Sequence, residues 1–443
     1  MHFIIAVSAI AALGGLLFGF DTAVISGAIP YIRGTFELTD YSLGWAVGSV
    51  LIGCAAGAAF AGRLADRFGR RCMLFVCAFL FAISGVGAGL ANTLATFAAF
   101  RCMGGLGVGA AAMISPMYIA ETAPAAWRGR LVSLYQLAIV LGILLAYFAN
   151  YVFADFGVNN WRWMFASQAL PSIIFGIALL FVPETPRWLT SKSRRQEAAA
   201  VLDRILGRDA AAAELLSIER SFALQSVAPA AEAFSKKYRP VLITGVLIAV
   251  FQQVTGINAI LYYAPVILSK TGLSESSSLF QTLGIGAVNV LATLLAIVWV
   301  DRLGRKRLLL AGSSLMGACL AVVALCFHFS YFDNYIVLIG MLLYVGAFAA
   351  TLGAVTWVYL SEIFPNRIRA VAMSAATLAL WLADFVVTYT FPVITERLSA
   401  AATLSCYLFF CVLAFLYVLR NVPETQGRRL EDIEALFAGR ATV

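Results

Sequence analysis

Three strongly charged side chains lie deep inside long apolar stretches of the sequence: Asp21, Arg101 and Asp384. A charge buried in a membrane is costly unless a partner compensates it, so such residues are usually functional. Asp21 and Arg101 are the natural partners for each other. Burial favours the protonated form of Asp21 and the arginine favours the carboxylate, so a change in exposure would load or release a proton. We predict that this pair couples proton movement to the function; the alternative is a static ion pair that joins two helices.

Amide side chains occupy other apolar stretches, and their chemistry suits a sugar. A sugar hydroxyl both donates and accepts hydrogen bonds, as an amide does, and aromatic rings can cover the apolar faces of a sugar ring. We therefore predict a sugar site made of amides and aromatic walls. The candidates are Gln136, Gln252, Gln253, Asn258 and Asn289, with Phe18, Tyr262, Trp357 and Trp381 as walls. Hydrogen bonding between helices is the alternative, and for Asn289 both interpretations stay open.

The elements that carry these residues are predicted to be membrane helices. Hydrophobic residues make up 62% of the 443-residue chain and charged residues 12%, whereas soluble domains contain about 25% charged residues. A run of about 20 apolar residues crosses a bilayer as a helix. Such runs occur at 3–31, 43–61, 72–91, 93–120, 131–153, 163–182, 240–268, 279–300, 308–332, 334–361, 370–395 and 400–419. The predicted fold class is an all-α integral membrane protein with twelve transmembrane helices.

The distribution of basic residues predicts the orientation of these helices. Most of the 31 Lys and Arg residues lie in alternate loops and in the C-terminal segment, whereas the opposite loops hold only Arg33, Lys270 and Arg397. Loops rich in Lys and Arg face the cytoplasm. We therefore expect both termini in the cytoplasm, and the net charge of +8 reflects topology rather than binding of nucleic acid.

Three motifs occur twice, in the same order and at nearly the same spacing. They are RLADRFGRR and VDRLGRKR, YIAETAPAAWR and YLSEIFPNRIR, and PETPR and PETQGR. We therefore expect two pseudo-symmetric halves of six helices, 1–182 and 240–420, with a cytoplasmic linker at 183–239 and a tail at 421–443. Internal repeats in a polytopic protein are typical of transporters, in which one half rocks against the other.

The repeated motifs place charges at the cytoplasmic edge. We expect ion pairs between the two halves that close a cytoplasmic gate; the alternative is that these charges serve only topology and helix capping. The Asp of each DRxGR motif is expected to accept from backbone N–H groups at a helix start, and the Gly to permit a tight turn. The gate candidates are Asp66, Arg70, Glu121, Arg128, Glu184, Arg305, Glu362, Arg369 and Glu424.

The linker shows helical periodicity. Val201, Leu202, Ile205 and Leu206 fall on one helical face, which predicts short amphipathic helices before a flexible QSVAPAAEA segment. A plain tether between the halves is the alternative.

The chain resembles the sugar porter family of the major facilitator superfamily over almost its full length, and it looks closest to bacterial proton-coupled pentose and hexose symporters. PETPRWL together with FQQVTGIN is specific to that family, whereas DRxGR marks only the superfamily. The resemblance implies the twelve-helix major facilitator fold. It implies that Asp21 and Arg101 couple protons, because proton-linked members carry both residues and passive relatives commonly lack the Asp. It also assigns sugar contacts to Gln136, Gln252, Gln253, Asn258, Tyr262, Asn289 and Trp357.

Three positions depart from the family pattern. Ala354 replaces a proline ahead of Trp357, which should stiffen the tenth span. Leu380 replaces a polar residue, and Asp384 replaces an asparagine three residues after Trp381. We expect Asp384 to contact sugar hydroxyls without being an obligatory proton carrier.

The sequence therefore predicts a proton-coupled monosaccharide symporter of the bacterial inner membrane that works by alternating access. A passive sugar facilitator is the first alternative, and a non-transporting sugar sensor is the second. We expect no enzyme activity, because the spans contain no nucleophile–base pair and no HExxH or GxSxG motif. We expect no cofactor and no metal site, since none of the eight cysteines forms a CxxC pair and only two histidines occur. The expected partners are a small sugar, a proton and the lipid bilayer, with no nucleic acid, and the expected state is a monomer.

Overall fold

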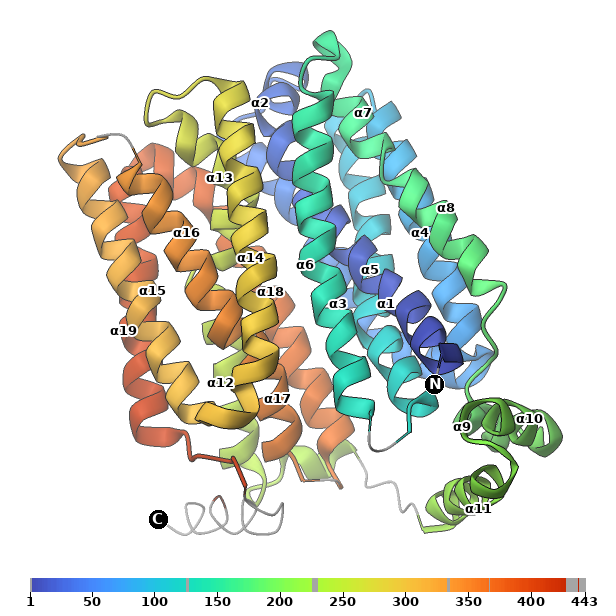
Figure 1. Ribbon diagram of the computed structural model, residues 1–443. Coiled ribbons are helices and arrows are strands. Elements are labelled where there is room, and N and C mark those ends of the chain that lie inside the picture. Colours follow the sequence, from blue (N-terminus) through green and yellow to red (C-terminus); the bar gives the residue numbers. More distant parts are fainter. Residues whose placement is uncertain are drawn as a thin grey trace. The chain divides into compact units, whose positions relative to one another are not determined.

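The computed structural model describes residues 2–124, 127–224, 230–332, 335–365, 367–427 and 437, and every regular element among them is helical (Figure 1). The chain packs into two compact units. Unit 1 comprises Met1–Thr22, Gly53–Ala146 and Arg162–Val227. Unit 2 comprises Ala23–Ile52, Tyr147–Trp161 and Ala228–Val443.

Unit 1 is built on a packed pair of long helices, α4 and α5, with α8 against α4. Gly19 of α1 and Gly142 of α6 lie where those two helices touch, and an added Cβ at Gly19 would collide with the Ile139 carbonyl. The glycines at this contact thus permit the close approach of α1 and α6. The helices are α1 (His2–Ala23), α3 (Asp40–Phe68), α4 (Arg70–Leu90), α5 (Leu94–Thr122), α6 (Arg128–Phe153), α7 (Asn160–Ala166), α8 (Ala169–Leu179), α9 (Pro186–Ser191), α10 (Arg195–Leu206) and α11 (Arg208–Leu224).

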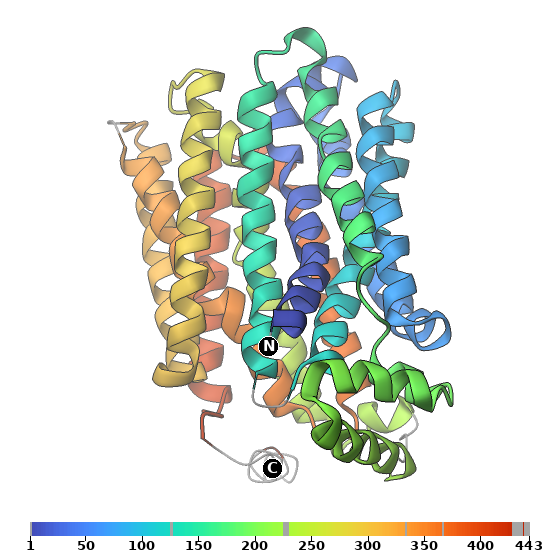
Figure 2. The same ribbon diagram turned by 45° about the vertical axis from the view of Figure 1, so that its right-hand side comes forward.

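Unit 2 contains the remaining helices, together with the first part of α3 and the last part of α6. Figures 1 and 2 show α15 and α19 side by side, and α12 packs against α18. Its elements are α2 (Ile25–Thr35), η1 (Gly157–Asn159), η2 (Ala230–Phe234), α12 (Arg239–Val254), α13 (Ile257–Ser269), α14 (Glu275–Leu303), α15 (Arg305–His328), α16 (Ile336–Phe348), η3 (Ala349–Gly353), α17 (Ala354–Ile363), α18 (Arg369–Arg397) and α19 (Ala400–Asn421).

Eleven helical segments of the described chain are long and apolar enough to cross a membrane. The sixth predicted span, 163–182, is interrupted, because α7 ends at Ala166 and α8 begins at Ala169. With this broken helix the twelve predicted crossings are present. The seventh span is also interrupted: Gly256 adopts a left-handed φ of 94° between α12 and α13, a conformation that glycine adopts without strain.

The compact units do not follow the boundaries of the sequence repeats. In unit 2, α2 packs against α13, and the Tyr147 hydroxyl donates to the Leu261 carbonyl at 2.9 Å. An added Cβ at Gly44 would meet the Tyr389 carbonyl. The ends of the first repeat that carry few basic residues therefore pack directly on the second repeat.

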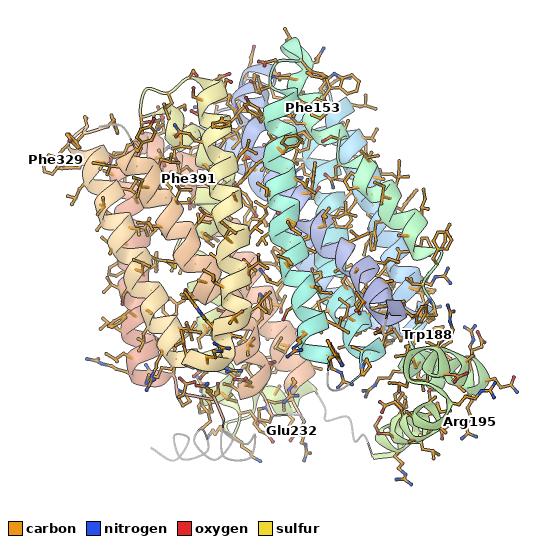
Figure 3. All side chains as sticks on the ribbon, in the orientation of Figure 1. Phe153, Trp188, Arg195, Glu232, Phe329 and Phe391 are labelled. Carbon is orange, nitrogen blue, oxygen red and sulfur yellow. The ribbon has the colours of Figure 1, made fainter. Side chains whose placement is uncertain are left out.

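The linker folds as the periodicity predicted. Helices α9, α10 and α11 bury an apolar core that includes Leu189, Val201, Leu202 and Leu215. Figure 3 labels Trp188 and Arg195 on two of these helices. The Trp188 indole donates to the Asp66 carbonyl at 3.0 Å, so within unit 1 the bundle contacts the end of α3. Most of the predicted flexible segment lies outside the described residues.

Candidate functional site

Asp21 and Arg101 meet inside unit 1, as the cost of isolated charges predicted. Both side chains are 0% exposed, and Arg101 Nη1 lies 3.2 Å from Asp21 Oδ2. The same nitrogen donates to the Asp21 carbonyl at 2.9 Å, and the guanidinium carbon lies 5.5 Å from the centre of the Phe165 ring. Nε and Nη2 of Arg101 find no hydrogen-bond partner in the described chain. The pair is therefore fully buried, and two guanidinium nitrogens have no hydrogen-bond partner in the described chain.

Gln168 joins this pair, although the sequence analysis did not select it. Its Nε2 donates to Asp21 Oδ1 at 2.8 Å, and its side chain is fully buried in the turn between α7 and α8. Gly104, one turn after Arg101, leaves room here, because an added Cβ would lie 3.0 Å from Asp21 Oδ1. The carboxylate of Asp21 on α1 thus has a cationic partner from α5 and an amide partner from the turn between α7 and α8.

The predicted sugar-site residues of unit 2 form a connected chain of hydrogen bonds. Gln253 Nε2 lies 3.4 Å from Gln252 Oε1, and Asn258 Nδ2 donates to Gln253 Oε1 at 2.9 Å. Asn258 Nδ2 also donates to Asp384 Oδ2 at 2.7 Å. Thr388, one turn later on α18, lies 3.2 Å from Asp384 Oδ1. The break at Gly256 is what brings the amides at the end of α12 and the start of α13 together.

The tenth span is irregular even though Ala354 replaces the family proline, and the stiffening expected from Ala354 stays a prediction. The helix is interrupted by a π-helical segment, η3, directly before Ala354. Gln252 Nε2 donates to the carbonyls of Leu352 and Gly353 at 3.1 and 3.3 Å. A side-chain donor thus satisfies carbonyls in the irregular turn, so the interruption does not require proline.

The other predicted wall and amide residues are distributed over both units. In unit 2, Tyr262, Asn289 and Trp381 are buried on α13, α14 and α18, and Trp357 is half-buried on α17. Phe18 and Gln136 are half-buried on α1 and α6 in unit 1. A sugar-binding role for this set remains a proposal.

The first copies of the repeated motifs form a charge cluster at the start of α4. Arg70 pairs with Glu121 at 2.9 Å and with Asp66 at 3.0 Å. Glu184 Oε1 accepts from the backbone N–H of Arg70 at 3.1 Å, and Thr185 Oγ1 donates to Glu121 Oε2 at 2.6 Å. Burial raises the pKa of Glu184, against the opposing effect of these N–H groups.

The second copies form the same cluster at the start of α15. Arg305 pairs with Glu362 at 2.8 Å, and Glu424 accepts from the backbone N–H groups of Arg305 and Lys306 at 2.8 and 3.1 Å. Thr425 Oγ1 donates to Glu362 Oε2 at 2.6 Å. The two copies of the motifs thus make the same set of side-chain contacts.

These clusters correct two predictions. The ion pairs Arg70–Glu121 and Arg305–Glu362 each lie within one repeat, so the expectation that they bridge the halves is wrong for this structure. The carboxylate that caps α4 comes from Glu184 and not from Asp66, whose side chain is 71% exposed. The predicted tight turn is present, since Gly69 and Gly304 have φ values of 100° and 88°.

Two other gate candidates lie outside the clusters. Arg128 is exposed at the first residue of α6. Arg369 donates from Nε to the Phe364 carbonyl at 3.1 Å.

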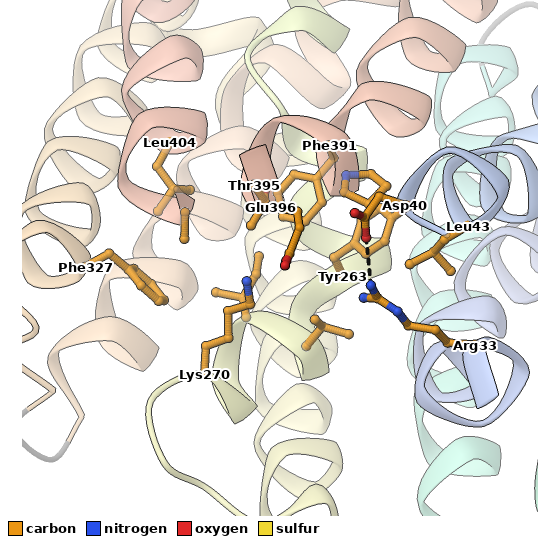
Figure 4. A pocket seen from close by; sticks show the side chains of 14 residues that line it. Arg33, Asp40, Leu43, Tyr263, Lys270, Phe327, Phe391, Thr395, Glu396 and Leu404 are labelled. Carbon is orange, nitrogen blue, oxygen red and sulfur yellow. Dashed lines mark hydrogen bonds and ion pairs between the residues drawn. The ribbon is translucent and has the colours of Figure 1, made fainter. Parts of the chain in front are cut away.

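A cavity of about 80 Å³ in unit 2 is separate from the predicted sugar site (Figure 4). It holds the Arg33–Asp40 ion pair, at 2.7 Å, beside Lys270 and Glu396. None of the predicted sugar residues lines it. Its lining residues come from α2, α3, α13, α15, α18 and α19, with Lys270 directly after α13.

Comparison with known proteins identifies the family. The family model described as "Sugar (and other) transporter" matches residues 7–437. The chain belongs to this family. It is 39% identical to the arabinose-proton symporter of Bacillus subtilis, over 99% of this chain and 96% of that protein. It is also 39% identical to the D-xylose-proton symporter of Escherichia coli, over 98% of this chain and 96% of that protein.

Solved structures agree with the fold of the transporter. The partially occluded inward-open conformation of the xylose transporter XylE from E. coli matches with a TM-score of 0.87 and 38% identity, over 97% of this chain and 100% of that chain. The proton:xylose symporter XylE bound to 6-bromo-6-deoxy-D-glucose matches with a TM-score of 0.81 and 38% identity, over 98% of this chain and 99% of that chain. The transporter is thus a multi-pass membrane protein of the major facilitator fold.

No cluster in the described part of the transporter offers three His, Cys, Asp or Glu side chains to a metal ion. The residue that sequence reasoning missed is Gln168. The rule that selected the other amides applies to it as well, because it lies in the predicted span 163–182. Its contact with Asp21 depends on the break between α7 and α8, which the sequence does not reveal.

Proposed function

We propose that the chain is a proton-coupled monosaccharide symporter of the bacterial inner membrane, with both termini in the cytoplasm, and that it has no enzyme activity. The observation that carries this proposal is the dry ion pair of Asp21 and Arg101, two residues on different helices that are both fully buried. Family membership and the names of the proton-linked relatives support the substrate class.

The ion pair supplies a mechanism for coupling. Arg101 pairs with Asp21 and Gln168 donates to it, and these contacts are proposed to favour the carboxylate over the neutral acid. Protonation from outside would cancel the attraction to Arg101 and release its helix, because a neutral acid no longer compensates the buried guanidinium. The loaded protein would then rock inward, the proton would leave to the cytoplasm, and the pair would re-form.

The amide chain of unit 2 is the proposed sugar site. Gln252, Gln253 and Asn258 form a chain of hydrogen bonds. The hydroxyls of a bound sugar would replace some of these hydrogen bonds or add to them. Tyr262, Asn289, Trp357 and Trp381 of the same unit are proposed to complete it. Phe18 and Gln136 are proposed as the sugar contacts of unit 1.

The two motif clusters are proposed to stabilise the cytoplasmic end of each repeat as a rigid body. Each ties the start of one helix to a carboxylate from a distant segment. Rigid ends would let a repeat move as a whole during alternating access. Arg128 and Arg369 are proposed to act at the same cytoplasmic edge.

The deciding experiment is sugar uptake by Asp21→Asn in proteoliposomes, with and without an imposed proton gradient. The labelled sugars are D-xylose, L-arabinose and D-glucose. We expect loss of gradient-driven accumulation with sugar binding retained, because the amide cannot carry the proton. The matched control is Asp40→Asn, which removes a partly exposed carboxylate paired with Arg33 and should accumulate sugar normally.

The alternatives predict different results. A passive facilitator would show uptake that ignores the gradient in the wild type and in Asp21→Asn alike. A sugar sensor would bind sugar without moving it. Normal uphill accumulation by Asp21→Asn would refute the coupling role of this residue.

A further inference from the structure

Two fully buried carboxyl groups in this chain have opposite surroundings. Asp21 is 0% exposed and has a guanidinium 3.2 Å away. Asp384 is also 0% exposed, but in the described chain it takes part in no ion pair, and its hydrogen-bond partners are neutral. The same chemical group is therefore compensated by a cation in one unit and by an amide and a hydroxyl in the other.

In the part of the chain that the structure describes, no ion pair compensates Asp384. The titratable side chains near it are tyrosines: Tyr407 of α19 interacts with it electrostatically, and the Tyr263 hydroxyl of α13 donates to the Thr388 carbonyl at 3.3 Å. Arg239 is the first residue of α12, and Glu362 is the second-last residue of α17 and is paired with Arg305. These charges lie at helix ends, whereas Asp384 lies in the middle of α18.

A buried carboxylate without a cation is so costly that such a group binds a proton instead. The contacts of Asp384 fit the neutral acid. Oδ2 accepts from Asn258 at 2.7 Å, as a carbonyl oxygen would. Oδ1 lies 3.2 Å from Thr388 Oγ1, and a hydroxyl can accept from a protonated Oδ1 as well as donate to it.

We propose that Asp384 remains a neutral carboxylic acid throughout the transport cycle and acts as a positioning residue that orients Asn258 in the sugar site. This inference rests on the proposed function. It assigns the two buried carboxyls different roles: the proton on Asp21 is transported, and the proton on Asp384 stays. A pair of like groups whose surroundings drive them to different protonation states commonly divides roles in this way.

The Asn258 amide explains why the neutral form matters for sugar. Both hydrogens of Nδ2 are used, on Gln253 and on Asp384, so Oδ1 of Asn258 is left to accept from a sugar hydroxyl. A bound sugar would remove still more water from the site. A charged Asp384 would therefore disfavour sugar binding, and affinity should fall where Asp384 ionises.

Infrared difference spectroscopy tests the protonation state without sugar and without transport. The full chain is placed in lipid nanodiscs near neutral pH, and spectra of the wild type are compared with those of Asp384→Asn and Asp21→Asn. We expect Asp384→Asn to remove a C=O stretching band of a protonated carboxyl, and Asp21→Asn to remove a carboxylate band instead. Loss of a carboxylate band in Asp384→Asn would overturn the proposal, whatever the protein transports.

Binding and coupling measurements test the role. With D-xylose, L-arabinose and D-glucose as probes, wild-type affinity should fall by about tenfold at alkaline pH, the effect of one buried hydrogen bond. Asp384→Asn should keep its affinity there and accumulate sugar at the wild-type ratio of protons to sugar. A changed ratio, or an alkaline loss of affinity that persists in Asp384→Asn, would refute the role; absence of all transport in the wild type would refute the proposed function and leave the infrared result standing.

Discussion

Replacing Gln168 tests the surroundings of Asp21 more sharply than removing the carboxylate itself. In Gln168→Met the side chain keeps its approximate volume but loses the N–H that donates to Asp21 Oδ1 at 2.8 Å. A hydrogen bond to a charged group contributes about 1.5–3 kcal/mol, and one to the neutral acid about 1 kcal/mol. The substitution therefore favours protonated Asp21 by the difference, about 0.5–2 kcal/mol.

That free energy sets the expected shift in the pH profile. One pH unit corresponds to about 1.4 kcal/mol, so the midpoint of proton-dependent sugar accumulation should move by about one unit. The sign is fixed, because losing a partner of the carboxylate keeps the acid protonated to a higher pH. The midpoint in Gln168→Met should thus be more alkaline than in the wild type.

The assay is initial sugar uptake by proteoliposomes across a pH series at a constant imposed gradient. Gln281→Met is the matched control, since it makes the same change on α14 of the other unit. An unchanged midpoint in Gln168→Met would show that the amide does not tune the carboxylate. A shift in Gln281→Met as large as that in Gln168→Met would show that the shift does not depend on the hydrogen bond to Asp21.

Two further predictions concern the sugar site and the first motif cluster. Gln252→Ala and Asn258→Ala should each weaken sugar binding by about 1–3 kcal/mol, because each leaves a buried partner unpaired; titration with labelled sugar measures this, and wild-type affinity in both would displace the site. Arg70→Gln and Glu121→Gln should lower the melting temperature in detergent, and the double variant should lose less than the sum of the two, because the residues pair at 2.9 Å. Additive losses would mean that the pair contributes no coupling energy.

Two contacts of the site could be predicted from the sequence alone. Asp21 and Arg101 could be paired from the sequence, because two isolated charges in apolar helices have few ways to be compensated. The amides on either side of Gly256 could be grouped because they are close in the sequence. The first inference needs only the residue types, and the second needs only the short spacing of the amides.

The predictions that were wrong concern contacts between residues that lie far apart in the sequence. The motif charges recur in both halves, and their types and order are the same whether Arg70 pairs within its repeat or across to the other. The sequence therefore could not choose between Glu121 and Glu362 as the partner of Arg70. Likewise, the acid that caps α4 comes from Glu184, far along the chain, and local capping rules favoured Asp66 because it lies next to the turn.

Restoring the family proline tests how the irregular tenth span tolerates that residue. In an intact helix a proline removes a hydrogen bond and clashes with the preceding turn, at a cost of about 3 kcal/mol or more. At Ala354 the backbone N–H reaches only the Thr351 carbonyl, φ is −83°, and the side-chain amide of Gln252 donates to the carbonyls just before it. Ala354→Pro should therefore lower the melting temperature in detergent far less than Ala375→Pro, which falls inside the unbroken helix α18. An equal loss in both variants would mean that η3 tolerates proline no better than a regular helix, and that the interruption depends on Ala354 itself.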